Sequence, residues 1–205
     1  MREAAAVEAI LFDLGGVLIE LAGVARMLEW CPDIGTTDEL WRRWLQSSAV
    51  RRYEVGATTG EAFADEIVRE FDLPVTPAAF LAAFEYWPRS LYPGATELLL
   101  RLAPRYRLAS VSNTNPLHWA RFCREWSLDA LFHDNFPSHR VGRLKPDTDY
   151  FAHVVEALDI PPERIVFVDD NRINVAAAQA FGLVARHVPS FSTLGAVLAS
   201  AGVAY

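Results

Sequence analysis

At residues 9–16 the chain reads Ala9-Ile10-Leu11-Phe12-Asp13-Leu14-Gly15-Gly16, and this segment decides the fold. Its first four residues are apolar without alternation, which is typical of a strand buried on both faces of a parallel sheet. Asp13 then stands at the carboxyl end of the strand, where parallel sheets bind ligands, and the glycines form a turn that lets the backbone approach a ligand. An Asp before glycines is also a common turn former, so this segment alone leaves the role of Asp13 open.

Further apolar runs, separated by helical patterns, predict the rest of a sheet. Apolar residues recur at helical spacing in residues 149–159, and an alanine-rich helix in residues 171–181 ends at Gly182. This alternation predicts an α/β fold with a doubly wound, Rossmann-like parallel sheet and right-handed crossovers. The predicted strands are residues 9–12, 108–111 and 165–168, with weaker runs at Leu131-Phe132 and Leu183-Val184-Ala185.

The alternation of strands and helices is interrupted between residues 21 and 87, where only helical patterns occur. Pro88 and Pro93-Gly94 mark the return to the alternating pattern. We therefore predict a core domain formed by residues 1–20 and 88–205, and an inserted helical cap domain formed by residues 21–87.

Composition limits the class of partner. The chain has 205 residues, of which 52% are hydrophobic, and its 19 basic and 26 acidic residues give a formal net charge of −7. This charge disfavours nucleic acid as a partner, and no apolar run is long enough to span a bilayer. Cys31 and Cys123 are isolated and predict reduced thiols. We expect a cytoplasmic protein, monomeric or homodimeric, that binds a small molecule and neither nucleic acid nor membrane.

A pair of carboxylates follows the strand at residues 165–168. Asp169 and Asp170 are adjacent, and Asn174 lies one helical turn beyond Asp170. One of the two carboxylates could cap the helix that begins near Asn171, but not both. If the pair converges with Asp13, the like charges raise one another's pKa unless a dication neutralises them, and oxygen ligands suit Mg²⁺.

Two further segments offer groups for an anion. Ser112-Asn113-Thr114-Asn115 follows the strand at residues 108–111 and precedes a helix that is expected to open after Pro116. This segment is either a phosphate cradle or an ordinary turn and helix cap. Lys145 is predicted on a loop after residues 138–144, which have no helical period, and its ammonium could stabilise a phosphate and an anionic Asp13.

Taken together, these four segments resemble the four motifs of the haloacid dehalogenase superfamily in order and spacing over nearly the whole chain. The helical insert is also similar to the cap of that superfamily. The four segments are Phe12-Asp13-Leu14-Gly15-Gly16-Val17, Val111-Ser112-Asn113-Thr114-Asn115, Leu144-Lys145-Pro146-Asp147 and Phe167-Val168-Asp169-Asp170-Asn171.

The resemblance implies a Mg²⁺-dependent phosphatase in which Asp13 is the nucleophile and becomes phosphorylated, with Lys145 as the second catalytic residue. The implied phosphate-binding groups are Ser112, Asn113, Lys145, Gly15 and Gly16. The implied metal ligands are Asp13, the backbone carbonyl of Gly15, Asp169 and Asp170, supported by Asn174.

One position departs from the superfamily pattern. Its phosphatases usually carry a second Asp two positions after the nucleophile as general acid and base, where this chain has Gly15. Such proton transfer contributes about a hundred- to ten-thousand-fold in rate, and His118 is a candidate replacement. The Asp-x-Gly variant is similar to a subgroup with glucose-1-phosphatase-like enzymes and the N-terminal phosphatase of epoxide hydrolase. The resemblance therefore implies a small phosphorylated metabolite, such as a sugar phosphate, as substrate.

Two other functions compete with the phosphatase. A 2-haloacid dehalogenase needs no acid for its halide leaving group, but carbon–halogen displacement creates no demand for the carboxylate pair. The other alternative is a catalytically weak metabolite-binding protein that lost turnover because the second Asp is Gly15 and that regulates a partner, although pure binding has no use for a nucleophile. In the cap, aromatic residues and arginines either line a pocket or form the cap core and a solvated surface. These residues are Trp30, Trp41, Trp44, Tyr53, Trp87, Arg42, Arg43, Arg51 and Arg52.

Overall fold

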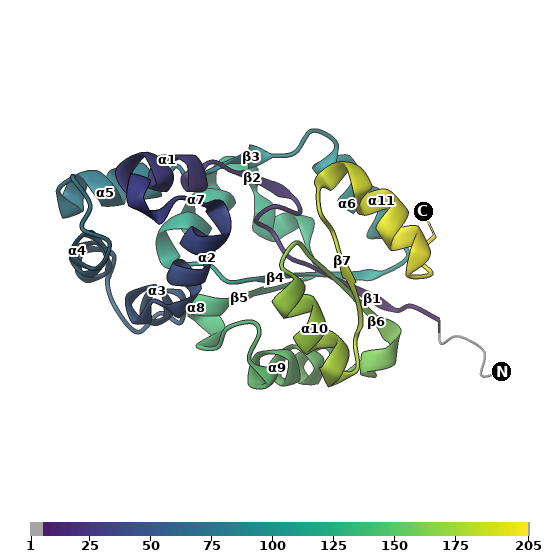
Figure 1. Cartoon of the computed structure of the whole chain (residues 1–205). Coiled ribbons are helices and arrows are strands. Elements are labelled where there is room, and N and C mark those ends of the chain that lie inside the picture. Colours follow the sequence, from purple (N-terminus) through teal and green to yellow (C-terminus); the bar gives the residue numbers. More distant parts are fainter. Residues whose placement is uncertain (1–5, 205) are drawn as a thin grey trace.

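A computed structural model describes residues 6–204 and contains a five-stranded parallel sheet with a group of helices beyond one end (Figure 1). The strand order is β5-β4-β1-β6-β7, with β1 in the centre. In register, Phe12 pairs with Ser110 on one side and with Val168 on the other. The strands are β1 (Ala9–Phe12), β4 (Arg107–Ser112), β5 (Asp134–Pro137), β6 (Ile165–Asp169) and β7 (Val184–His187).

Helices cover both faces of this sheet, because successive side chains of a strand point to opposite sides. Ile10 and Phe12 face a buried cluster with α6 (Ala95–Leu102), α7 (Pro116–Trp126) and α11 (Phe191–Ser200). Ala9 and Leu11 face a second cluster with α9 (Thr148–Leu158) and α10 (Arg172–Phe181). The predicted α/β doubly wound fold is confirmed, including the helix end at Gly182, which has a left-handed backbone conformation.

A small antiparallel pair of strands joins the sheet to the other helices. It consists of β2 (Ile19–Leu21) and β3 (Pro88–Leu91). The sequence analysis missed both strands, because they are short and only partly buried. The segment between them forms α1 (Gly23–Trp30), η1 (Pro32–Ile34), α2 (Thr37–Gln46), α3 (Ser48–Glu54), α4 (Gly60–Glu70) and α5 (Pro77–Phe84).

These cap helices pack around an aromatic cluster of their own. In this cluster the ring centroid of Trp44 lies 6.2 Å from that of Phe63 and 5.4 Å from that of Trp87. Hydroxyl groups accept hydrogen bonds at the amino ends of α2 to α5, which satisfies free backbone N–H groups there. The domain boundaries at residues 21 and 87 stay a prediction.

Two local predictions are wrong. Leu131 closes a 3₁₀ helix (η2, Leu128–Leu131), and the strand lies three residues later as β5. β5 is an edge strand whose polar residues bond to its neighbour, Asp134 with Arg107 and Asn135 with Ser110, so its sequence lacks an apolar run. The segment after β5 is also not wholly irregular, because it contains a short helix, α8 (Ser138–Val141). A further 3₁₀ turn, η3 (Pro162–Arg164), precedes β6.

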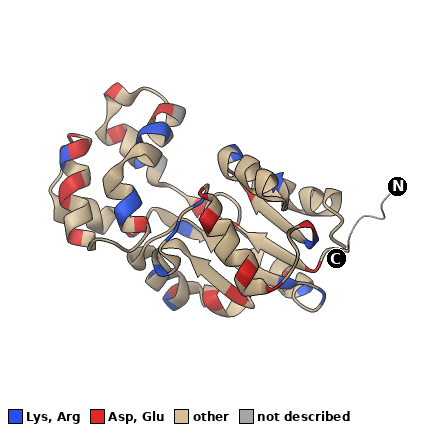
Figure 2. Cartoon of the chain, turned by 90° about the horizontal axis from the view of Figure 1, so that it is seen from below, with Lys and Arg blue, Asp and Glu red and all other residues tan. Residues whose placement is uncertain are grey.

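Charged residues of both signs are distributed over the helices of both parts of the molecule (Figure 2). Within residues 6–204 no helix is long and apolar enough to cross a membrane. Both cysteines are free thiols, as predicted.

Candidate functional site

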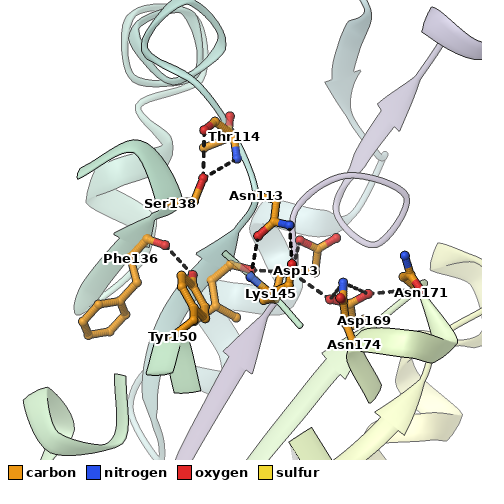
Figure 3. A network of polar contacts seen from close by, with 11 residues as sticks. Asp13, Asn113, Thr114, Phe136, Ser138, Lys145, Tyr150, Asp169, Asn171 and Asn174 are labelled. Atoms are coloured by element: carbon orange, nitrogen blue, oxygen red, sulfur yellow. Dashed lines mark hydrogen bonds and ion pairs between the residues drawn. The ribbon is translucent and has the colours of Figure 1, made fainter. Parts of the chain in front are cut away.

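The predicted site residues meet at one edge of the sheet, because β1, β4 and β6 are parallel neighbours and their carboxyl ends coincide. Asp13 follows β1, Ser112 ends β4 and Asp169 ends β6. The loop before α9 brings Lys145 to the same place (Figure 3). The four sequence motifs are therefore one spatial cluster.

Lys145 is the centre of this cluster and is only 3% exposed. Its Nζ donates hydrogen bonds to Asp13 Oδ1 at 2.7 Å, to Asp169 Oδ2 at 2.7 Å and to the Val111 carbonyl at 2.9 Å. Burial acts to lower the pKa of Lys145, but the charges of Asp13 and Asp169 outweigh it and hold the pKa above its ordinary value. The ammonium is therefore charged, and its three donors are all in use.

Asn113 positions the backbone of the lysine loop. Its side-chain oxygen accepts a hydrogen bond from Lys145 N at 2.9 Å, and its amide nitrogen donates to Lys145 O at 2.8 Å. The Asn113 side chain is thus occupied within the protein, which leaves its main chain for any contact with phosphate. Ser112, like Asp13, lines a cavity over this cluster.

Three carboxylates crowd together beside Lys145. Asp13, Asp169 and Asp170 each offer an oxygen, and these oxygens lie within 4.8 Å of one another. Burial, aided by Asp169 and Asp170, raises the pKa of Asp13 to about 8 against the opposing effect of Lys145. Loss of surrounding water and the charge of Asp169 raise the pKa of Asp170 to about 6. A dication bound by oxygen ligands would relieve this repulsion, so the residues fit Mg²⁺.

The adjacent carboxylates of Asp169 and Asp170 differ in how many hydrogen bonds they accept from the protein. Asp169 is fully buried; its Oδ1 accepts from Asn171 N at 2.7 Å, and Asn174 Nδ2 donates to both of its oxygens. Asp170 lies in the cavity wall, where surrounding protein raises its pKa although part of its surface stays exposed, and it has no such partners among the described residues. Neither carboxylate caps α10, because Asn171 does so by accepting from Ile173 N. Asn174 supports the site through Asp169.

The turn after β1 brings backbone close to Asp170. Gly16 has a φ of +74°, and a Cβ atom added there would lie 2.2 Å from Asp170 Oδ2. Only glycine fits such a position without displacing the carboxylate. A Cβ atom at Gly15 would instead meet the end of the Leu21 side chain at 3.0 Å.

His118 has a structural position that does not suit the proton-donor hypothesis. Its Nε2 donates to the Phe84 carbonyl at 2.7 Å, and its Nδ1 faces Asn115 Nδ2 at 3.1 Å. Burial lowers the pKa of His118 to about 4, so the ring is neutral and both nitrogens are occupied. This argues against His118 as the replacement for the missing acid, because a donor needs a free proton directed at the leaving group.

A cavity of about 730 Å³ lies over the cluster, between the sheet edge and the cap helices. Of the predicted cap aromatics, Trp41, Trp44 and Trp87 line it. Trp44 and Trp87 also pack in the cap cluster, together with Trp30 and Tyr53, which do not line the cavity. The arginines are mostly engaged elsewhere. Arg42 lines the cavity but pairs with Glu39, Arg43 lies over the Phe71 ring, Arg51 pairs with Asp147 and Arg52 pairs with Glu66.

Glu54, at the end of α3, lines the same cavity and was missed by the sequence analysis. Burial raises its pKa to about 7, against the lowering effect of Lys145 and Arg51. The sequence holds no signal for it, since one Glu among cap residues looks like any surface carboxylate.

Comparison with known proteins places this geometry in a family. A family model for haloacid dehalogenase-like hydrolases matches residues 7–182. The chain belongs to the haloacid dehalogenase-like hydrolase family. The superfamily predicted from the four motifs is therefore confirmed, and this family member is a hydrolase.

Three proteins illustrate what this hydrolase resembles. A sesquiterpene phosphatase of Aspergillus oryzae is 28% identical over 187 residues, covering 88% of this chain and 89% of that protein. An (S)-2-haloacid dehalogenase of Xanthobacter autotrophicus is 29% identical over 197 residues, covering 91% and 76%. The crystal structure of a HAD family enzyme from Bacteroides thetaiotaomicron, in complex with magnesium and inorganic phosphate, has a TM-score of 0.71 and 28% identity, covering 89% and 94%.

Proposed function

We propose that this protein is a Mg²⁺-dependent phosphatase that hydrolyses a small phosphate monoester through an aspartyl-phosphate on Asp13. The observation that carries the proposal is a buried ammonium bonded to Asp13 and Asp169, with Asp170 left free within 4.8 Å. A haloacid dehalogenase has no use for a further free carboxylate beside its anionic substrate. The sesquiterpene phosphatase and the magnesium and phosphate complex among the related proteins support the same reading.

In this proposal Asp13, Asp170 and the carbonyl of Gly15 hold the metal, while Asp169 holds Lys145. When bound, magnesium neutralises the carboxylates and polarises the phosphoryl oxygens. An Asp13 oxygen forms a bond to phosphorus as the ester P–O bond breaks, and water then hydrolyses the phospho-aspartate. Ser112 and the main chain at Asn113 bind the phosphoryl oxygens, and Lys145 holds Asp13 in position.

Two kinds of substrate are candidates, a sugar phosphate and the phosphate ester of an apolar alcohol. The Asp-x-Gly motif suggests the sugar phosphate. The lining of the cavity favours an apolar alcohol, because four of the large apolar side chains that remain exposed border it. These are Leu21, Trp41, Leu45 and Ile173. The similarity to a sesquiterpene phosphatase also supports an apolar alcohol as the leaving group.

Phosphate release from p-nitrophenyl phosphate, with Mg²⁺ and with a chelator, tests the proposed function. Chelation and Asp13→Asn are each expected to lower the rate by about a thousandfold or more, because they remove charge neutralisation and the nucleophile. Asp65→Asn, an exposed cap carboxylate outside this cavity, is the control. Equal rates with and without chelator, a fully active Asp13→Asn, or halide release from a 2-haloacid would contradict the proposal.

A further inference from the structure

Hydrolysis of an alkyl phosphate needs a proton for the leaving oxygen, since an alkoxide is a poor leaving group. Gly15 has no side chain to supply it, and both ring nitrogens of His118 are engaged. Among the carboxyl groups that line the cavity, Glu54 comes from the cap, whereas Asp13 and Asp170 come from the edge of the sheet. It therefore borders the space that a leaving group would occupy.

The end of α3 is fastened to the core, which keeps Glu54 beside the site. The single hydroxyl proton of Ser138 is shared between the carbonyls of Glu54, at 2.6 Å, and Thr114, at 2.9 Å, and Ser138 Oγ accepts a hydrogen bond from Thr114 N. Two residues on, Gly56 has a φ of +75°, and a Cβ there would lie 2.5 Å from the His139 carbonyl. Arg51 also pairs with Asp147, two residues after Lys145. Several contacts thus hold this turn against the loops that carry the site.

The carboxyl group of Glu54 itself is unpaired. Lys145 faces it from the core but has given its three donors to other atoms, and Arg51 on the same helix is paired with Asp147. His139 on α8 is neutral, because burial lowers its pKa to about 4. Across residues 6–204 the Glu54 side chain makes no hydrogen bond or ion pair. Its pKa of about 7 means that a large fraction carries a proton at neutral pH.

We propose that Glu54 is the general acid and base that takes the place of the missing second Asp, an inference that rests on the proposed phosphatase function. As the Asp13–phosphorus bond forms and the ester P–O bond breaks, the leaving oxygen takes the Glu54 proton and departs as an alcohol. The Glu54 carboxylate then takes a proton from the water that attacks the phospho-aspartate. Phosphate and Asp13 are released, and Glu54 is protonated again.

The test compares two leaving groups in the full-length protein with Mg²⁺. Glu54→Gln is expected to lower kcat for octyl phosphate by about a hundredfold or more, but to lower kcat for p-nitrophenyl phosphate less than about tenfold, because nitrophenolate leaves without a proton. Glu54→Asp should recover part of the octyl phosphate activity. Glu29→Gln, a cap carboxylate whose side chain is 62% exposed, is the matched control and should match the wild type on both esters.

The outcomes distinguish a failure of the Glu54 proposal from a failure of the proposed phosphatase function. An equal loss on both esters in Glu54→Gln, or no loss on either, overturns the role of Glu54 and leaves the phosphatase standing. A wild-type protein that hydrolyses neither ester overturns both. An unchanged circular dichroism spectrum and melting temperature in Glu54→Gln show that a loss is not one of folding.

Discussion

Lys145 is the side chain on which the geometry of the site depends. It is almost fully buried, and its three hydrogen bonds reach Asp13, Asp169 and the end of β4. Removing the ammonium would leave buried carboxylates without compensation, which is costly in a low-dielectric environment. The same residue that orients the proposed nucleophile therefore also makes its burial possible.

The two glycines after Asp13 should respond differently to substitution by Asp. At Gly15 the atoms nearest to a new Cβ belong to the flexible end of Leu21, which is 39% exposed, whereas at Gly16 a new Cβ collides with Asp170 in a left-handed backbone. Gly15→Asp is expected to leave octyl phosphate hydrolysis unchanged or raise it by about tenfold, since it restores an acid near the leaving group.

The same substitution should also restore most of the activity lost in Glu54→Gln. Gly16→Asp is the contrasting variant and should abolish Mg²⁺-dependent turnover. Steady-state kinetics of both variants measure this difference. Equal effects of the two substitutions would show that the turn does not have the geometry seen here.

At the scale of elements, α7 ties the core to the end of the cap. His118 donates to the carbonyl of Phe84 at the end of α5, and Arg121 donates to the carbonyls of Glu85 at 3.0 Å and Arg89 at 3.2 Å. Phe84 and Glu85 lie at the carboxyl end of α5, where carbonyls lack partners within the helix, and Arg89 lies in β3. The position of the cap over the cavity is therefore set in part by side chains of a core helix.

This link predicts a pH-dependent stability. The pKa of His118 is about 4 in the folded protein and near 6.5 when unfolded, so between these values the unfolded chain binds more protons and stability falls as pH falls. From pH 7 to pH 5 this one histidine should lower the free energy of unfolding by about 2 kcal/mol.

His118→Gln, which keeps a donor for Phe84, should remove that part of the pH dependence in urea unfolding. His139 shifts in the same direction and remains, so the dependence is reduced rather than abolished. His153→Gln, at a histidine on α9, is the control. An unchanged difference between pH 7 and pH 5 in His118→Gln would contradict the prediction.

At the scale of the whole molecule, the cavity exists because the cap helices stand over the carboxyl edge of the sheet (Figure 1). The core supplies the charged floor, Asp13, Lys145 and Asp170, and the cap supplies most of the apolar wall. In the proposed phosphatase the nucleophile and the metal site therefore lie in the core, whereas the cap contributes Glu54 and most of the surface that contacts the leaving group.

This division predicts a preference for apolar esters. Octyl phosphate should have a kcat/KM at least about tenfold above that of glucose 1-phosphate, since burying one large apolar group is worth about 1.5 to 3 kcal/mol. Leu45→Asn, in the cavity wall, should raise KM for octyl phosphate and leave glucose 1-phosphate unaffected. Leu100→Asn, 61% exposed and outside this cavity, is the control. A higher kcat/KM for the sugar phosphate would reverse the assignment.

The amino-acid sequence by itself determined the central strands, the doubly wound class and the meeting point of the four motifs. Buried parallel strands have a distinctive apolar pattern, and topology places their carboxyl ends together. The edge strand β5 escaped prediction because its polar residues bond to the neighbouring strand, so that no apolar run marks it.

Only the tertiary structure decided the rest of the site. It shows that the oxygens of Asp169 are occupied while Asp170 is free, that His118 bonds to the end of α5, and that the unpaired Glu54 lines the same cavity as Asp13. A side chain's partners and its access to water depend on residues far away in the chain. The sequence therefore cannot distinguish a hydrogen-bonded carboxylate from a free one, because the difference arises from tertiary packing.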